Sequence, residues 1–287
     1  MNNKILVTGA TGGIGTELLK ILSGMNLPVK AAARNPEKIS KMNLANTEPY
    51  SFDFTNQDSY NNLMSGVNKL FLFVPSDHPE FDDITYKLTN HAKNSGVEKI
   101  VFLSAMGTED ADESPLFEAE LNIQGSGIAY TFLRPNWFMQ NFNTFMAKGI
   151  IENNEIAVPA GDAKTSFVDA RDISAAAAAA LTDTNHDNKA YTITGGESLS
   201  YYDVADYISK ASGREIKYNN ISDGHYSNLL LESGMDKTDI RAMVWFYQLV
   251  RRGESATVSK DLKTIIGREI YSFQQYANDY AGYWALK

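Results

Sequence analysis

The sequence predicts an α/β protein in which a doubly wound parallel sheet is followed by a smaller, mostly helical C-terminal region. Strand-like runs alternate with helical patterns through the first half, which is typical of a parallel sheet with helices on both faces. A glycine-rich turn separates the first strand from the first helix, and the alternation loosens from about Pro135. We expect one domain over residues 1–150 and a second region over 151–287 packed on it, with some segments returning to the sheet.

The predicted strands are short apolar runs bounded by turn residues. They are Lys4–Thr8, Pro28–Ala33, Pro49–Phe52, Lys69–Val74, Lys99–Leu103 and Ala129–Leu133, with a later one at Ala190–Thr194. A loop-rich stretch, Asn153–Ser166, precedes a helix that Asp172 is expected to cap. Ser200–Ser212 and Lys237–Arg252 are the clearest helices of the second region.

Composition excludes several classes of function. The 287 residues carry a net charge of −9, which argues against broad binding to nucleic acid or to an anionic membrane. Cysteine is absent, so disulfides, thiolate nucleophiles and Cys-ligated metals are excluded, and the four histidines lack metal-ligand spacing. No apolar run reaches ~18 residues, and the first strand leaves no room for a signal peptide. We expect a cytoplasmic protein without a metal.

The glycine-rich turn, residues 5–15 with the sequence ILVTGATGGIG, predicts a phosphate site in a Rossmann-like domain. A side chain at Gly9 would obstruct the tight turn, and one at Gly12 would hold a pyrophosphate off the backbone. A side chain at Gly15 would push the helix off the strand. The helix N-terminus adds positive potential. We expect the cofactor to contact Gly9, Thr11, Gly12, Gly13, Ile14 and Gly15; the alternative is a turn with no ligand.

The end of the second strand favours NADP over NAD. An acidic residue there would bind the ribose 2′-hydroxyl of NAD, and none occurs from Pro28 to Arg34. The guanidinium of Arg34 can instead hold a 2′-phosphate, and Lys38 adds a second positive charge one helical turn later. The alternative is that Arg34 is an ordinary solvated cation.

Other polar residues follow the later strands. Asp53 and Phe54 come after the third strand, where the adenine edge should lie; Asp53 either accepts from the adenine amino group or caps a helix. The tips of the fourth and fifth strands should flank the nicotinamide half, with Ser104 as a polar contact or a local backbone partner. His78 either approaches a substrate or lies solvated in its loop.

A group of apolar residues follows the sixth strand and suits a flat apolar substrate. The candidates are Trp137, Phe138, Met139 and Phe142, of which some must be core because aromatics at helical spacing usually pack inside. Trp245, Phe246 and Tyr247 on a later helix are either an opposing wall or, as most such residues are, core.

Four stretches together resemble the NmrA-like branch of atypical short-chain dehydrogenases. They are the glycine turn, RNPEK at 34–38, SGIAYTFLRPNWF at 126–138 and FVDARD at 167–172. Members of that branch include NADPH-dependent quinone oxidoreductases, triphenylmethane dye reductases and NADP-binding redox sensors, and the wider superfamily includes nucleotide-sugar epimerases. The resemblance places Gly9, Thr11, Gly12, Gly15, Arg34, Lys38, Asp53, Val74, Pro75 and Ser104 along the cofactor groove.

The sequence departs from the superfamily in the Tyr-x-x-x-Lys motif, whose lysine lowers the phenol pKa for proton exchange. Only Tyr283 has a lysine four residues later, Lys287, at the far C-terminus. If Glu120 is aligned with the acid that commonly follows the motif, the Lys position falls on Leu116 and the Tyr position on Asp112.

These observations predict an NADPH-dependent reductase that passes hydride to a flat electrophilic acceptor, such as a quinone or dye, without a Tyr–Lys pair. Such a product takes its proton from water, so the protein need supply only proximity and orientation. The alternative is a non-catalytic NADP(H)-binding redox sensor. A nucleotide-sugar epimerase ranks third, since alcohol oxidation needs a base. The partner is a small aromatic molecule, and a homodimer is left open.

Overall fold

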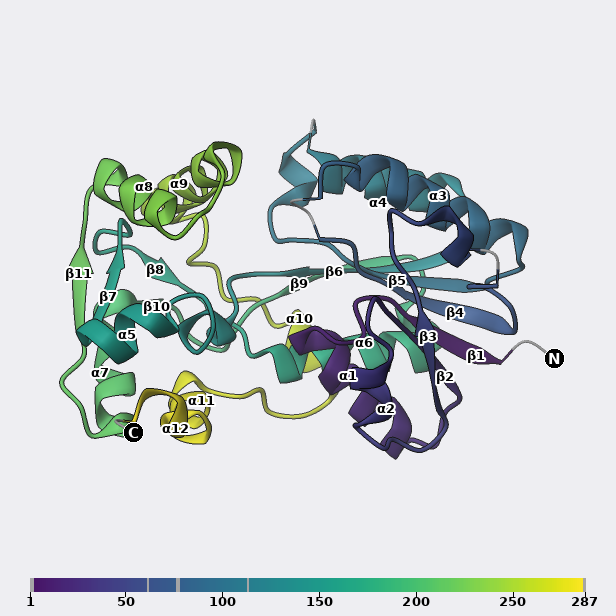
Figure 1. Cartoon of the computed structure of the whole chain (residues 1–287), viewed down its shortest axis with the longest axis horizontal. Coiled ribbons are helices and arrows are strands. Elements are labelled where there is room, and N and C mark those ends of the chain that lie inside the picture. Colours follow the sequence, from purple (N-terminus) through teal and green to yellow (C-terminus); the bar gives the residue numbers. More distant parts are fainter. Residues whose placement is uncertain (1–2, 61, 76–77, 113, 286–287) are drawn as a thin grey trace. The chain divides into compact units, whose positions relative to one another are not determined.

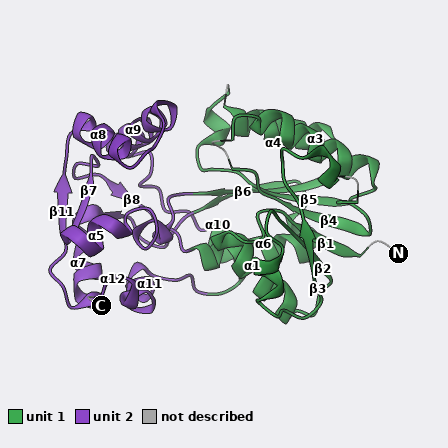
Figure 2. Cartoon of the chain, in the orientation of Figure 1, with its two compact units in different colours: residues 1–135, 170–193, 261–268 green, residues 136–169, 194–260, 269–287 purple. Residues whose placement is uncertain are grey.

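The computed structural model describes residues 3–60, 62–75, 78–112 and 114–285. The chain forms two compact units (Figure 2). Unit 1 contains residues 1–135, 170–193 and 261–268; unit 2 contains residues 136–169, 194–260 and 269–287. The boundary expected after residue 150 falls within helix α5 (Ala147–Asn153) of unit 2.

Unit 1 is built on a parallel seven-stranded sheet, and the predicted α/β fold class is confirmed. The strand order is β3-β2-β1-β4-β5-β6-β9, so the order reverses beside β1, which is the doubly wound pattern. The strands are β1 (Lys4–Val7), β2 (Val29–Ala33), β3 (Thr47–Ser51), β4 (Val67–Leu72), β5 (Lys99–Leu103), β6 (Ala129–Pro135) and β9 (Lys189–Ile193).

Helices cover both faces of this sheet (Figure 1). Helices α3 (Phe81–Asn94) and α4 (Pro115–Gly125) pack together on one face. The other face carries α1 (Gly13–Gly24), α2 (Glu37–Ser40), α6 (Ala170–Thr182) and α10 (Asp261–Ile266). Helix α6 is rich in alanine and packs against α1. Small side chains allow this close approach.

The prediction that Asp172 caps the helix after residue 166 is wrong. Helix α6 begins two residues earlier, at Ala170, and Asp172 lies inside its first turn. The Asp172 side chain is 1% exposed and forms an ion pair with Arg268, whose Nη1 lies 2.8 Å from its Oδ1. A partner in a segment almost 100 residues later therefore pairs with this carboxylate.

Unit 2 combines helices with two small sheets, of which β7 and β11 form a parallel pair and β8 and β10 an antiparallel pair. Besides α5, its elements are β7 (Glu155–Val158), β8 (Lys164–Thr165), β10 (Leu199–Ser200), α7 (Tyr201–Ser212), β11 (Lys217–Asn220), α8 (Asp223–Glu232), α9 (Lys237–Arg251), α11 (Phe273–Asp279) and α12 (Ala281–Trp284). The stretch expected to be loop-rich, residues 153–166, thus contains two strands. They are four and two residues long, too short to show an alternating pattern.

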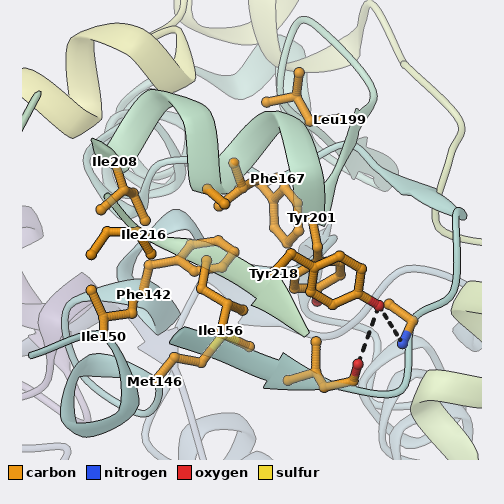
Figure 3. Packing of buried hydrophobic residues seen from close by; sticks show 14 of the residues in the cluster. Phe142, Met146, Ile150, Ile156, Phe167, Leu199, Tyr201, Ile208, Ile216 and Tyr218 are labelled. Atoms are coloured by element: carbon orange, nitrogen blue, oxygen red, sulfur yellow. Dashed lines mark hydrogen bonds between the residues drawn. The ribbon is translucent and has the colours of Figure 1, made fainter. Parts of the chain in front are cut away.

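The core of unit 2 is rich in aromatic rings, several of which meet edge to face (Figure 3). The ring of Phe142 lies 5.1 Å from that of Phe167, and the ring of Phe167 lies 5.5 Å from that of Tyr201. The hydroxyl of Tyr218 donates to the carbonyl of Val158 and accepts from the amide of Ala160, both at 3.2 Å. The polar end of this buried ring is therefore satisfied by backbone groups.

Candidate cofactor and acceptor site

The glycine turn after β1 has a geometry that only glycine permits. Gly9 has φ +62°, and a Cβ there would lie 2.5 Å from Cδ1 of Phe73. A Cβ at Gly15 would lie 2.2 Å from the carbonyl oxygen of Gly9. A Cβ at Gly12 would lie 3.3 Å from that same oxygen, which already accepts the Gly12 amide at 3.0 Å. The turn and the first helical turn of α1 are therefore packed backbone against backbone.

The outer side of this turn is open. Thr11, Gly12 and Gly13 are exposed, and α1 begins without a side-chain cap and without an acidic residue in its first turn. Its free N–H groups and positive dipole end fit a phosphate. From behind, the hydroxyl of Ser174 in α6 donates to the carbonyl of Ile14 at 2.9 Å. The residues present thus fit the pyrophosphate of a dinucleotide.

Two cations follow β2. Arg34 comes directly after the strand and Lys38 lies in α2, and both side chains are exposed. Neither forms an ion pair within the described part of the chain. Asp53 lies close by, since Arg34 is one of the charges that lower its carboxyl pKa. The main causes of that lowered pKa are two hydrogen bonds that the carboxylate accepts from Thr55.

Residues that directly follow β4 and β5 are held in place by hydrogen bonds to nearby groups. The hydroxyl of Thr8 accepts from the amide of Phe73 at 2.8 Å and donates to the Phe73 carbonyl at 2.9 Å. Val74 is buried and Pro75 half-buried. The hydroxyl of Ser104 is buried and donates to Oγ1 of Thr108 at 3.2 Å. This bond favours a local role for Ser104 over direct contact with a cofactor.

With Glu120 aligned as above, the lysine position of the superfamily pattern lies in helix α4 and the tyrosine position lies just before it. Leu116 lies half-buried in its first turn, and Asp112 is exposed just before it. Further along α4, Glu120 forms a bidentate bond with Arg134 at the end of β6, at 3.0 and 2.6 Å. Arg134 also pairs with Glu109 in the loop after β5 at 3.1 Å. The network fixes α4 against the carboxyl ends of β5 and β6.

The candidate acceptor residues belong to unit 2 and differ in exposure. Trp137 and Phe138 are half-buried, whereas Met139 and Phe142 are 2% and 0% exposed in the core. The ring of Trp137 lies 5.1 Å from that of Tyr247, which is fully buried. On the same helix, α9, Trp245 and Phe246 are 49% and 43% exposed. Only Trp137 and Phe138 of the four candidates thus present surface within their own unit.

Comparison with known proteins decides the family. The sequence pattern of the NmrA-like family matches residues 1–278. The chain belongs to the NmrA-like family. This confirms the resemblance drawn from the glycine turn and the three later stretches.

Relatives of this NmrA-like chain include the NAD(P)H azoreductase of Xenophilus azovorans, 33% identical over 283 residues that cover 96% of this chain and 98% of the relative. The prestalk A differentiation protein A of Dictyostelium discoideum is 26% identical over 278 residues, 96% of this chain and 91% of that protein. The crystal structure of an NADPH-dependent quinone oxidoreductase of Escherichia coli complexed with NADPH matches with a TM-score of 0.83 at 26% identity, over 96% and 99% of the two chains.

Two residues of this NmrA-like protein have a place in the structure that the sequence does not predict: Phe73, which is not a sequence candidate, and His78, which is a candidate for another position. Phe73 lies against Gly9 just after the end of β4, and its place directly before the predicted groove residue Val74 was the available signal. His78 is half-buried beside Phe54, with ring centroids 6.5 Å apart, and so lies next to a residue that the sequence assigns to the adenine edge. The sequence alone predicts either a substrate contact or a solvated loop position for His78.

Two further checks concern the described residues alone. They include no helix long and apolar enough to cross a membrane. They also include no group of three or more His, Asp or Glu side chains placed to hold a metal ion. Lys287, the partner of Tyr283 in the sequence motif, lies outside the described residues.

Proposed function

We propose that this NmrA-like protein is an NADPH-dependent reductase whose acceptor is a flat, electrophilic molecule such as a quinone, an azo compound or a cationic dye. The observation that carries the proposal is the open glycine turn, where uncapped N–H groups of α1 meet exposed backbone at Gly12 and Gly13. A dinucleotide phosphate is the ligand that this arrangement fits.

The choice of NADPH over NADH rests on the end of β2. Strand β2 has no acidic residue, and the exposed cations Arg34 and Lys38 follow it. Each is available for a 2′-phosphate, because neither is paired within the described ranges. A planar guanidinium can form two parallel bonds to phosphate, and Lys38 adds a point charge.

The acceptor class is supported by relatives and by two side chains. A relative at 33% identity is named as an azoreductase, and a structural relative at 26% identity is named as a quinone oxidoreductase. Both names refer to flat conjugated electrophiles. Trp137 and Phe138, which follow β6 directly, present half-buried aromatic surface on which such a molecule can stack.

The proposed chemistry uses no protein phenol. When bound, NADPH supplies the hydride; a quinone or azo acceptor then takes a proton from water, whereas a cationic dye is neutralised by the hydride and needs none. Tyr247, which lies beside Trp137, and Tyr201, which lies beside Tyr247, are poor acids, because desolvation raises the pKa of both well above the usual range. Leu116 cannot lower the pKa of any phenol, since it carries no charge. The side chains of this protein therefore act by binding and orienting the cofactor and the acceptor, which can lower the activation barrier by several kcal/mol.

An assay of NADPH oxidation against a panel of quinones, azo compounds and triphenylmethane dyes tests this proposal. Steady turnover of at least one acceptor class is expected, with NADPH preferred over NADH. The competing function is a redox sensor that binds NADP(H) and turns nothing over, and the side chains at Asp112 and Leu116 favour it. Tight cofactor binding with no turnover on any acceptor would establish the sensor and refute the reductase.

A further inference from the structure

Three side chains from two separate loops meet beside the cofactor residues of unit 1. Asp53 and Phe54 follow β3, and His78 follows β4. The ring of Phe54 contacts His78 in an edge arrangement at 68° and contacts Phe52 of the core at 5.1 Å. His78 and Arg34 both act electrostatically on the Asp53 carboxylate, so both lie near it. Phe54 is therefore held between the core and His78.

The hydrogen bonds of this cluster leave one acceptor and one donor unused. Oδ1 of Asp53 accepts from the amide of Thr55 at 3.0 Å and from its hydroxyl at 2.9 Å. Oδ2 has no partner among the described residues. Nδ1 of His78 accepts from the amide of Glu80 at 3.1 Å. A neutral ring whose Nδ1 accepts must carry its proton on Nε2. That N–H likewise has no partner within the described ranges.

A free acceptor and a free donor beside an aromatic ring match the chemistry of adenine. Its amino group donates, and the ring nitrogens on either side of that group accept. Phosphate, in contrast, carries only acceptors at neutral pH and would be repelled by Asp53. Arg34 and Lys38 already provide the cations that a 2′-phosphate needs.

We propose that His78 determines recognition of the cofactor's base: its Nε2–H donates to a ring nitrogen adjacent to the adenine amino group, while Oδ2 of Asp53 accepts from that amino group. This inference rests on the proposed function, since the base is that of the nicotinamide cofactor. It assigns to His78 a role independent of the 2′-phosphate.

Binding measurements on the full chain test the assignment without an activity assay. Isothermal titration would compare NADPH, NADH and two analogues of NADPH, one with hypoxanthine and one with 7-deazaadenine in place of adenine. The variants are His78→Ala, His78→Gln, which restores an N–H donor, and His225→Ala as the control. His225 is an exposed histidine of α8 in unit 2. Circular dichroism would verify that each variant folds.

The expected result is that His78→Ala weakens NADPH and NADH by the same factor, about 3- to 10-fold for one lost hydrogen bond. His78→Gln should recover part of this loss, and His225→Ala should change nothing. The effect of His78→Ala should disappear with whichever analogue lacks the contacted nitrogen: hypoxanthine replaces the acceptor N1 by a donor, and 7-deazaadenine removes N7.

Other outcomes overturn the proposal in distinct ways. A loss confined to NADPH would place His78 on the 2′-phosphate. An equal loss with all four ligands would mean that His78 only shapes the loop, and no loss would mean that it does not contact the cofactor. These results leave the reductase proposal standing. Failure of the wild-type protein to bind any of the four ligands would overturn both.

Discussion

Replacing Gly15 by alanine should destabilise the protein, whereas the same change at Gly13, two residues earlier, should not. Both glycines lie in the first turn of α1. The new Cβ at position 15 would lie 2.2 Å from the Gly9 carbonyl oxygen and 2.9 Å from Cα of Ala10, whereas a Cβ at position 13 would meet nothing within 4 Å. The pair therefore separates backbone packing from any general effect of losing a glycine.

The magnitude follows from the distance. Favourable contacts begin at about 3.5 Å, so the start of α1 must move by about 1 Å from the turn. The Ser174 hydroxyl bond to Ile14 and the packing of α6 on α1 oppose that movement. Overpacking of this kind costs about 1–3 kcal/mol. For a chain of this size each kcal/mol lowers Tm by about 2–4 °C, so Gly15→Ala should lower Tm by about 2–12 °C.

Differential scanning calorimetry of the two variants without cofactor measures this difference directly. Gly13→Ala should stay within about 0.5 kcal/mol of wild type, as expected for an exposed site without special contacts. The reasoning would be refuted by equal Tm values for the two variants. A wild-type Tm in the Gly15→Ala variant would show that α1 moves away from the turn without cost.

Four further predictions concern binding, catalysis and stability. Arg34→Ala should weaken NADPH by about 1.5–3 kcal/mol and NADH far less, and equal losses in calorimetry would exclude a 2′-phosphate contact. Gly12→Val should abolish binding of both cofactors in a folded protein, because the added carbons cover the phosphate approach; unchanged affinity would place the ligand elsewhere. Trp137→Ala should lower kcat/KM for a quinone or dye more than any single Tyr→Phe change. The pH profile of turnover should lack the pKa of a Tyr–Lys pair. A ~10³-fold loss of kcat in one Tyr→Phe variant would instead identify a displaced catalytic phenol. Glu120→Ala should destabilise the fold by about 3–5 kcal/mol in urea unfolding, because Arg134 loses a buried bidentate partner, and a loss under 1 kcal/mol would mean that Glu109 suffices.

Sequence patterns predicted the strands of the sheet because buried parallel strands leave a local signal. The β5 prediction agrees at both ends, and β2 and β3 differ by one or two residues. The prediction for β4 extends too far, to Val74. The strand ends at Leu72, because the amide of Phe73 bonds the Thr8 side chain instead of a neighbouring strand. No local pattern could reveal that bond.

The candidate site was predictable where backbone conformation requires a residue type, as at Gly9 and Gly15. The site was less predictable where tertiary contacts decide which side chains are exposed and which lie together. Trp137 and Phe142 look equivalent in sequence, yet the first keeps exposed surface and the second is in the core. His78 and Phe54 are 24 positions apart, and only the fold of the β3 and β4 loops brings their rings together.

The interleaving of the two units has a consequence for synthesis of the chain. Six strands and the glycine turn of unit 1 belong to the first 135 residues. Its remaining elements, α6, β9 and α10, come later in the sequence, after segments of unit 2. On a ribosome, the turn therefore exists before Ser174 can bond Ile14 and before α6 supports α1. Until β9 emerges, β6 remains an open sheet edge able to pair with another chain. The nascent chain thus exposes that edge to aggregation during the interval in which the first segment of unit 2 and α6 are being made.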